Sequence, residues 1–525
     1  MKNVSLLDCT LRDGGYINDW NFGFNTIKKI IKDLIAAKVE FIEVGFLRND
    51  LYNENCTIFN NCKQIERILP EERKETKFVA MALHNKYDIN KLEPYDGKTI
   101  EAIRVTFHDY DIQEGLAFAK KVKEKGYKVF CNPINIMGYS DENIIKLVYQ
   151  INEIEPYGFS IVDTFGAAMM SDLARIYYLV NHNLKSNIVL GLHLHENLSL
   201  AYSLAQNFIG MAEGRKCIID ASLLGMGREP GNLCMELMVD YMDRIYGYNY
   251  DMDPLLDAID DYIAPLKEKY SWGYNIAYAL SAKYNLHINY AEFFLVKGRL
   301  RAKQINYILS EIDESKKTTF DEKYVEKLFI DYQNIAVNDQ TTIQKLKEML
   351  EGKEVLILAP GLTIETEKEK IKEQVANKKI FTIAANFDGG NYTCDCWFFS
   401  NIVRFENIVK EIEPDYIFVT SNLMHNDYPF ENVLNYMDLV EDEFMCDNCV
   451  IMILRLLFKM GISEVMLAGF DGFNERGCDY AEKYTDMYED KNRKMKRQEN
   501  DKNNKALEIL NRKMRIKFLT SSIYS

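Results

Sequence analysis

The chain has 525 residues, 47% hydrophobic and 27% charged, which is the composition of a folded protein large enough for several domains. Its formal net charge of −15 argues against non-specific nucleic-acid binding, which needs a basic face. No apolar run is long enough to span a bilayer, no signal-peptide pattern precedes the first predicted strand, and the eleven cysteines are scattered. We therefore expect a cytoplasmic protein.

The first predicted strand, residues 4–7, is followed by a polar stretch that contains Arg12 and Asp13 and then by two glycines. A buried strand that ends in charges and a glycine turn is typical of the mouth of a parallel α/β barrel. Arg12 offers a fixed fork of donors for a carboxylate or an oxyanion. Asp13 offers a hard oxygen ligand for a divalent metal.

Strand-like and helix-like segments alternate over the first half of the chain. We predict strands at 4–7, 41–45, 78–83, 102–107, 128–132, 158–163, 188–195 and 217–224, and helices at 22–40, 112–125, 141–153, 171–183 and 198–213. This alternation predicts a (β/α)8 TIM barrel over residues 1–250. A doubly wound sheet is the alternative, but no G-x-G-x-x-G follows the first strand.

Polar residues mark the ends of several predicted strands, where a barrel would bring them to one mouth. They include His108, Asp163 and Thr164. Glu43 lies inside a strand that is otherwise apolar, where a carboxylate is costly unless it is paired. We treat Glu43 as a catalytic candidate, with a buried ion pair to an arginine as the alternative.

The run His193-Leu194-His195 is the strongest local signal. Residues i and i+2 of a strand face the same side, so both imidazoles should enter one site. Two imidazoles and a carboxylate form a facial set that leaves positions open for substrate. The alternative is a pair of ordinary histidines in a strand.

Three separated motifs carry a resemblance to a known family. They are LDCTLRDGG at 7–15, VDTFGA at 162–167 with the histidine strand, and DASLLGMGREPGN at 220–232. Together they resemble the DRE-TIM metallolyases over about residues 1–300, and look closest to the 4-hydroxy-2-oxovalerate (4-hydroxy-2-oxoacid) aldolase branch. The resemblance implies a carbon–carbon lyase that acts reversibly on a 4-hydroxy-2-oxo acid through a metal-bound pyruvate enolate.

The family pattern also implies roles for particular residues. Asp13, His193 and His195 would hold Mn2+ or Mg2+, Asn232 would complete the coordination, and Arg12 would stabilise the enolate oxygen. The chemistry agrees, because a metal and an arginine both stabilise the charge of an enolate. A Schiff-base lysine is the other solution, but these motifs contain no lysine.

The sequence departs from the aldolase branch at one position. That branch carries an acid/base histidine four residues after the arginine, where this chain has Tyr16. Tyr16 could relay protons or could merely line the pocket, another group such as His108, His84 or Glu43 could act, or the substrate could differ. A tyrosine beyond the barrel reaches the site in the aldolases, and Tyr274 or Tyr278 in the run WGYNIAY is the candidate here, with helix packing as the alternative. Asp163 and Thr164 are the candidate substrate-binding residues.

Two rival functions remain open at this stage. One is a Claisen-type acyl-CoA condensing enzyme of the same superfamily, although that branch tends to carry a glutamate after R-D-G, which is absent here. The other is a non-catalytic binding or scaffold barrel, suggested by Tyr16. Retention of Asp13 together with both histidines favours the metal-dependent aldolase.

The rest of the chain is predicted as a helical extension, 251–350, and a Rossmann-like α/β domain, 351–525. A faint likeness of the last domain to those found with surface-glycan enzymes suggests a nucleotide-linked or phosphorylated sugar as its ligand, and a role in glycan-precursor synthesis. Cys394, Cys396, Cys446 and Cys449 could bind zinc, but buried free thiols are favoured. We also expect a homo-oligomer.

Overall fold

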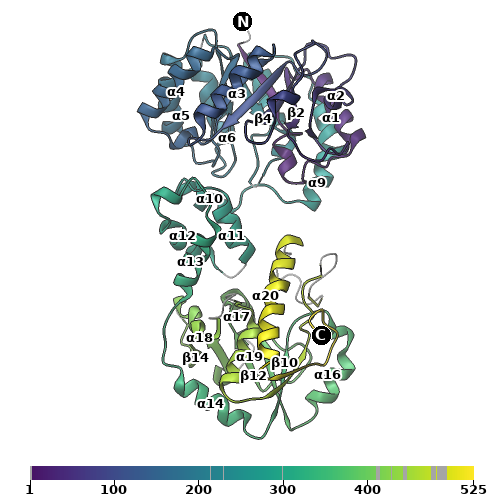
Figure 1. Ribbon diagram of the computed structural model, residues 1–525, viewed down its shortest axis with the longest axis vertical. Helices are drawn as coiled ribbons and strands as arrows, with labels where there is room; N and C mark the ends of the chain where they lie inside the picture. The colour runs from purple at the N-terminus through teal and green to yellow at the C-terminus, as the bar shows by residue number, and fades with distance from the viewer. Residues whose placement is uncertain are drawn as a thin grey trace. The chain divides into compact units, whose positions relative to one another are not determined.

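The computed structural model describes residues 3–212, 214–228, 230–297, 300–409, 414–426, 428–440, 446–474, 480–481 and 493–525 (Figure 1). The chain divides into two compact units. The first comprises Met1–Ala291 and Asp313–Phe320, and the second comprises Glu292–Ile312 and Asp321–Ser525. None of the helices in these described ranges is both long and apolar enough to cross a membrane.

The first unit contains a closed barrel of eight parallel strands, which confirms the predicted TIM barrel. Its strands are β1 (Val4–Asp8), β2 (Phe41–Leu47), β4 (Lys77–Leu83), β5 (Ala102–Phe107), β6 (Lys128–Pro133), β7 (Gly158–Val162), β8 (Val189–His193) and β9 (Cys217–Ala221). The barrel closes because β1 pairs with β2 on one side and with β9 on the other. A two-residue strand, β3 (Ile58–Phe59), extends the pairing of β2.

Helices follow most barrel strands and surround them in Figure 1. They are α1 (Phe24–Ala36), α2 (Cys62–Glu66), α3 (Ile112–Glu124), α4 (Asp141–Ile154), α5 (Met170–Asn183), α6 (Ala201–Met211) and α7 (Met235–Tyr246), followed by α8 (Asp253–Ala258), α9 (Ala264–Lys269) and α10 (Ile276–Lys283). The apolar stripe that predicted α1 is buried in the structure, from Ile27 to Ile35.

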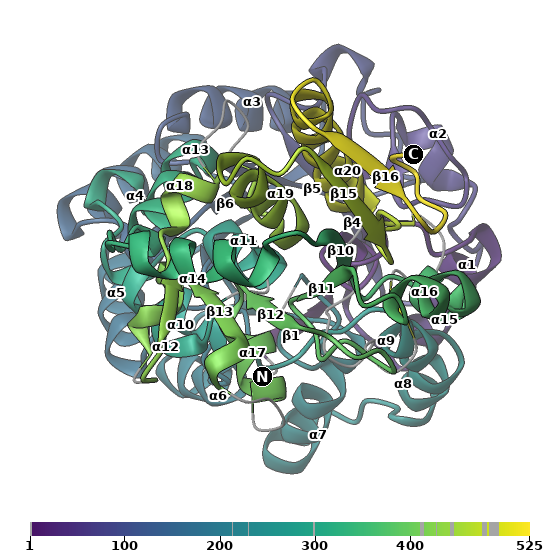
Figure 2. The same cartoon turned by 90° about the horizontal axis from the view of Figure 1, so that it is seen from below.

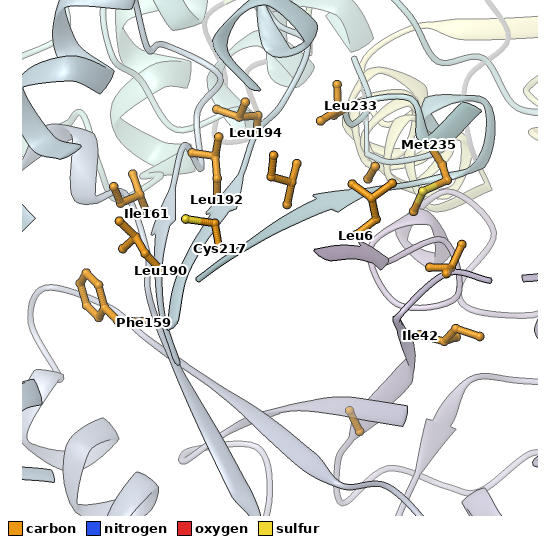
Figure 3. Close-up of a cluster of buried hydrophobic side chains, with 14 of the residues drawn as sticks. Leu6, Ile42, Phe159, Ile161, Leu190, Leu192, Leu194, Cys217, Leu233 and Met235 are labelled. Carbon is orange, nitrogen blue, oxygen red and sulfur yellow. The ribbon is translucent and has the colours of Figure 1, made fainter. Parts of the chain in front are cut away.

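Side chains alternate between the two faces of each barrel strand. In β8, Leu190 and Leu192 belong to the large apolar cluster between the strands and the helices, and Leu194 continues that face (Figure 3). Val189 belongs instead to a small apolar cluster inside the barrel. His193 and His195 therefore share the inward face, as the sequence pattern predicts.

The layer above this inner apolar cluster carries charges. Phe41, Ala102 and Ile218 belong to the inner cluster, and the residues two positions further along the same strands are Glu43, Arg104 and Asp220. All three are at least 98% buried. The centre of the barrel thus changes from apolar to ionic toward the carboxyl ends of the strands.

The second unit contains a parallel sheet of seven strands in the order β14-β13-β12-β11-β10-β15-β16. The strands are β10 (Glu354–Leu358), β11 (Ile380–Ala385), β12 (Cys396–Phe399), β13 (Ile417–Thr420), β14 (Asn432–Leu434), β15 (Glu464–Ala468) and β16 (Arg515–Phe518). The order reverses at β10, which is the pattern of a doubly wound sheet. A second α/β domain is therefore confirmed.

Helices pack on both faces of this sheet (Figure 2). One face is covered by α14 (Gln340–Leu350), α18 (Tyr436–Val440), α19 (Cys449–Lys459) and α20 (Arg493–Asn511), and the other by α15 (Thr363–Thr366), α16 (Lys368–Val375) and α17 (Ile402–Ile408). At the turn before α15, the backbone amide and the hydroxyl of Thr363 both donate to Asp471. Cys394 and Cys396, two of the four zinc candidates, are buried free thiols.

The helices of residues 251–350 are shared between the two units. Those from α8 to α10 belong to the barrel unit, whereas α12 (Ala302–Ser310), α13 (Glu322–Gln333) and α14 belong to the second unit. The helix α11 (Asn289–Lys297) contains the boundary. The three-part division of the sequence analysis stays a prediction about which segments fold independently.

Candidate functional site

Asp13, His193 and His195 meet at the mouth of the barrel. One ligand atom from each lies within 4.8 Å of the other two, and no other group of three such side chains occurs among the described residues. The Asp13 Oδ2 atom is 3.6 Å from His195 Nε2 and 4.0 Å from His193 Nε2. The pair of imidazoles from β8 and the carboxylate that follows β1 thus converge as predicted.

The two imidazoles are oriented by bonds on their far sides. His193 Nδ1 donates to Asp220 Oδ2 at 2.9 Å, and His195 Nδ1 donates to the backbone carbonyl of Asp163 at 2.7 Å. Each bond places the ring proton on Nδ1 and leaves the Nε2 lone pair facing Asp13. A metal-binding histidine is normally fixed in this way by a carboxylate or a carbonyl.

Asn232 lies beside the same centre because the loop after β9 folds back on itself. An isolated bridge pairs Asn232 with His195, and Gly231, with φ of 108°, allows the close return of the chain to Gly225. The Asn232 Nδ2 donates to the carbonyl of Met226 at 3.0 Å. Its Oδ1 is buried without a hydrogen-bond partner.

The donor set fits a divalent cation. Asp13 Oδ2 and Asn232 Oδ1 are both buried oxygens without a hydrogen-bond partner, a situation that normally costs free energy. Together with two imidazole nitrogens they offer the mixed oxygen and nitrogen ligands that first-row divalent metals accept. These unpaired atoms are therefore available as ligands for a cation.

Arg12 is held in place by two carboxylates. Its Nε donates to Glu43 Oε2 at 2.7 Å, and its Nη1 donates to Asp13. Arg104 Nη1 donates to the same Glu43 oxygen at 3.1 Å, and Arg104 Nη2 donates to Asp220. Charged groups of opposite sign therefore alternate from Asp13 through the barrel centre to Asp220, the carboxylate that orients His193.

Burial and these ion pairs set the protonation of the site. Burial alone would raise the pKa of Asp13, but Arg12 and the two imidazoles hold it well below its ordinary value. Arg104 and His193 likewise lower the pKa of Asp220 against the effect of burial. Burial lowers the pKa of His193, which favours the neutral imidazole, whereas Asp13 raises the pKa of His195 against burial.

The loop that carries Arg12 and Asp13 is fixed by tertiary contacts. Trp20 Nε1 donates to the carbonyl of Arg12 at 2.7 Å, and Thr57 Oγ1 donates to the carbonyl of Leu11 at 2.6 Å. A Cβ atom at Gly15 would lie 2.1 Å from the Trp20 ring, so only glycine fits there. The glycine turn seen in the sequence thus serves packing, and Arg12 is pre-positioned.

A cavity of about 270 Å³ opens in front of these groups. Arg12, Asp13 and both histidines line one part of it, and His287, Ile288 and Thr318, from beyond the barrel but within the same unit, also line it. His287 Nδ1 accepts from the backbone amide of Asn289 at 3.2 Å. Burial, and then the charge of Arg228, lower the pKa of His287 to about 4, so its ring is neutral near pH 7.

Tyr16 and His108, two of the predicted catalytic residues, both line this cavity. Tyr16 is 42% exposed, and its ring packs edge-on against Trp20 with centroids 4.7 Å apart. His108 stacks on Tyr110 with centroids 4.7 Å apart, and burial lowers the pKa of its imidazole. Both side chains thus border the same cavity as Arg12 and Asp13.

Of the four other predicted site residues, only Thr164 lines the cavity. Glu43 is fully buried between Arg12 and Arg104 and is not among the described residues that line the cavity. The Asp163 carboxylate accepts from the amides of the loop that follows it, and Tyr278 is 4% exposed and outside the cavity lining. Thr164 lines the cavity, and its hydroxyl accepts a hydrogen bond from the backbone amide of Asn135 at 2.7 Å.

Several residues that build the site received no assigned role from the sequence. Arg104 and Asp220 complete the ionic chain, and Arg104 had the same signal as Glu43, a charge inside an apolar strand. Asn132 lines the cavity. His287 could not be predicted as a site residue, because no motif near it in the sequence indicates that the segment after α10 lies at the barrel mouth.

This chain is similar to several known proteins. Residues 3–258 match the family model described as HMGL-like. The 4-hydroxy-2-oxovalerate aldolase of Bacillus cereus is 26% identical over 273 residues, covering 50% of this chain and 77% of that protein. The Moorella thermoacetica protein of the same name is 25% identical over 281 residues, covering 51% and 79%. Among solved structures, the N-terminal domain of a candidate aldolase from Bacteroides vulgatus aligns with 26% identity and a TM-score of 0.48, covering 56% of this chain and 96% of that one.

Proposed function

Because residues 3–258 match the HMGL-like family model, we propose that this protein is a divalent-metal-dependent aldolase that cleaves or forms a 4-hydroxy-2-oxo acid. The family and the names of the relatives identify a carbon–carbon lyase of the pyruvate-aldolase class. One observation carries the metal dependence: Asp13, His193 and His195 converge, beside an unpaired Asn232 oxygen, at the edge of the cavity.

In the proposed assignment Asp13, His193 and His195 hold the cation, and Asn232 adds its amide oxygen. A divalent cation bound there would act as a Lewis acid that polarises the oxygens of the 2-oxo acid. Mn2+ and Mg2+ are the expected ions, since both accept oxygen ligands.

Arg12 stabilises the negative charge that develops on the 2-oxo acid. Its bonds to Glu43 and Asp13 fix the plane of the guanidinium, and its further N–H donors remain for a ligand in the cavity. A donor fixed before the reaction loses little free energy to reorganisation when charge appears. The contacts of Glu43 support a positioning role through Arg12, because its carboxylate is enclosed between two arginines.

The reaction requires two proton transfers. In cleavage, the 4-hydroxyl loses a proton to a base, the bond between C3 and C4 breaks, and its electron pair forms the enolate. The C3 carbon then takes a proton, giving pyruvate and an aldehyde. Tyr16 and His108 are the cavity-lining groups that we assign to these transfers.

We expect the protein to exchange the methyl protons of pyruvate with deuterated water. Enolisation requires only the pyruvate half of the reaction, so this assay is independent of the aldehyde. Exchange measured by NMR should stop on addition of EDTA and return with Mn2+ or Mg2+, and Arg12→Ala should slow it by about a hundredfold or more, as for loss of one oxyanion donor. Failure of the wild type to exchange any 2-oxo acid would refute the lyase assignment for this barrel.

We expect Tyr16→Phe to lower the exchange rate by at least about tenfold, the usual size of a general acid–base effect. The substitution keeps the ring that packs on Trp20 and removes only the hydroxyl. Tyr178→Phe, at an exposed position of α5, is the matched control and should behave as the wild type. A fully active Tyr16→Phe protein would remove Tyr16 from the proton path and leave His108.

The C-terminal domain has a cavity of its own, of about 250 Å³. Its lining includes Gly361, Asn386 and Gly469, which follow β10, β11 and β15. Ligands of doubly wound sheets bind at this place, beyond the strand ends where the strand order reverses. The position supports a ligand-binding role, and a nucleotide-linked or phosphorylated sugar remains our prediction for the ligand, as does a role in surface-glycan precursor synthesis.

We expect the reaction to take place in the cytoplasm, in keeping with the free thiols of Cys9, Cys131 and Cys217. The homo-oligomer stays a prediction from the sequence.

A further inference from the structure

The barrel topology separates the two ends of a bound substrate. Counting around the closed sheet, β6 lies four strands from β1 in either direction, so the end of β6 is across the mouth from Arg12 and Asp13. Asn232 follows β9, the neighbour of β1, whereas His193 and His195 lie at the end of β8, two strands from β1 and two from β6. A 2-oxo acid bound by Arg12 and Asp13 therefore lies across the mouth from the wall at the end of β6, toward which its other half can extend.

That wall presents two buried amides with unused hydrogen-bonding capacity. Asn132, the inward residue two positions after Phe130 of the inner cluster, is 3% exposed, and Asn135 is 6% exposed. Both line the cavity, and the side-chain oxygen of each is without a hydrogen-bond partner. A buried amide oxygen normally has a partner, so these two await one from a ligand.

The side chains of this wall limit the kinds of ligand group that the amides of Asn132 and Asn135 can bind. Among the described residues that line the cavity after β5, β6 and β7, none is lysine or arginine, and Asp109 adds a carboxylate. Phosphate or carboxylate groups beside Asn132 and Asn135 would therefore meet no cation of this wall, because the arginines that line the cavity, Arg12 and Arg228, follow β1 and β9. A hydroxyl group suits an amide, because it can both donate to the oxygen and accept from the nitrogen.

We propose that the aldehyde half of the substrate is a neutral, hydroxylated aldehyde of the aldose type, recognised by Asn132 and Asn135. The inference rests on the proposed aldolase function and adds its substrate class. In the direction of condensation, C3 of pyruvate loses a proton and bonds to the aldehyde carbon, and the aldehyde oxygen gains a proton to become the 4-hydroxyl. The other hydroxyls of the aldehyde take no part in bond making and are bound by the two amides.

Aldehydes of equal length test this specificity in the full-length protein with pyruvate and Mn2+. We expect kcat/KM for D-glyceraldehyde to exceed that for propanal by at least about tenfold, because a site built to bind a hydroxyl discriminates strongly against its absence. D-glyceraldehyde 3-phosphate should be a poorer substrate than D-glyceraldehyde. Equal rates for propanal and D-glyceraldehyde, or a preference for the phosphate, would overturn the proposal.

Two variants then assign the preference to the wall. Asn132→Leu keeps the side-chain volume but cannot hydrogen-bond, and Asn135→Gly removes the side chain while tolerating the φ of 52° at this residue. Each should reduce the ratio of the two kcat/KM values toward one, whereas Asn143→Leu, at an exposed position of α4, should not. The ratio within one variant does not depend on how much of the protein is folded. Retention of the full ratio in both variants would refute the role of the wall.

The pyruvate exchange assay distinguishes the two levels of failure. If the wild type exchanges pyruvate protons but shows no preference for hydroxylated aldehydes, the substrate class is wrong and the aldolase function stands. If the wild type does not exchange the methyl protons of pyruvate at all, both the aldolase function and the proposed class of aldehyde are refuted.

Discussion

Replacing His193 by alanine is expected to remove the bound divalent cation and to lower the rate of pyruvate exchange about a thousandfold. The imidazole supplies one of the three ligand groups that converge at the mouth, and the bond from its Nδ1 to Asp220 fixes its direction. A Lewis acid at the reacting oxygen contributes several kcal/mol, and each 1.4 kcal/mol corresponds to about a tenfold change in rate. Metal content by mass spectrometry and the exchange rate together measure the effect.

His182→Ala is the matched control for this substitution. His182 lies near the end of α5, where its ring stacks on Tyr178 with centroids 5.9 Å apart, and it takes no part in the cluster. The control protein should keep the metal and the activity of the wild type. Equal metal content in His193→Ala and His182→Ala would show that the cation binds elsewhere.

Arg104→Met is expected to destabilise the barrel by about 3–5 kcal/mol, the usual cost of removing one partner of a buried ion pair. Arg104 is 1% exposed and donates to both Glu43 and Asp220. Methionine fills similar space but leaves Asp220 with only His193, and Glu43 with only Arg12, in the barrel centre. The loss therefore comes mainly from carboxylates left without a partner charge.

Urea unfolding followed by tryptophan fluorescence can isolate this effect in the full chain. Trp20 and Trp272 belong to the barrel unit and Trp397 to the second unit, so a Trp397→Phe background reports on the barrel. Arg67→Met, which breaks the exposed pair between Arg67 and Glu54, is the control and should leave the midpoint near that of the background protein. An unchanged midpoint in Arg104→Met would contradict the account of the ionic chain.

The barrel and its metal candidates could be predicted from sequence because both depend on local periodicity. The two-residue alternation along β8 places Leu190 and Leu192 on the outer face of the barrel. It places His193 and His195 on the inner face, independently of the other strands. The polar stretch after β1 similarly indicates the end of a strand. Parallel strands of a barrel all end at the same rim. The sequence therefore predicts that Asp13 lies near the two histidines, even though the register between the strands is not known from it.

The pairing within the ionic chain and the contribution of His287 to the cavity could not be predicted in the same way. Pairing Arg104 with Asp220 requires the relative heights of β5 and β9, which neither strand encodes alone. The same limit applies to Glu43, whose sequence signal fits a catalytic acid and a buried ion pair equally well. His287 reaches the cavity from a segment beyond the barrel, through tertiary packing that leaves no local pattern.

The position of the cation tests the central claim most directly. Crystals soaked in Mn2+ and measured at the manganese absorption edge should give one strong anomalous peak at the barrel mouth, at about 2.0–2.3 Å from Asp13 Oδ2 and from the Nε2 atoms of His193 and His195, the range of first-row metal–ligand bonds. An anomalous peak elsewhere, with none between these three side chains, would contradict the metal-dependent lyase proposed here.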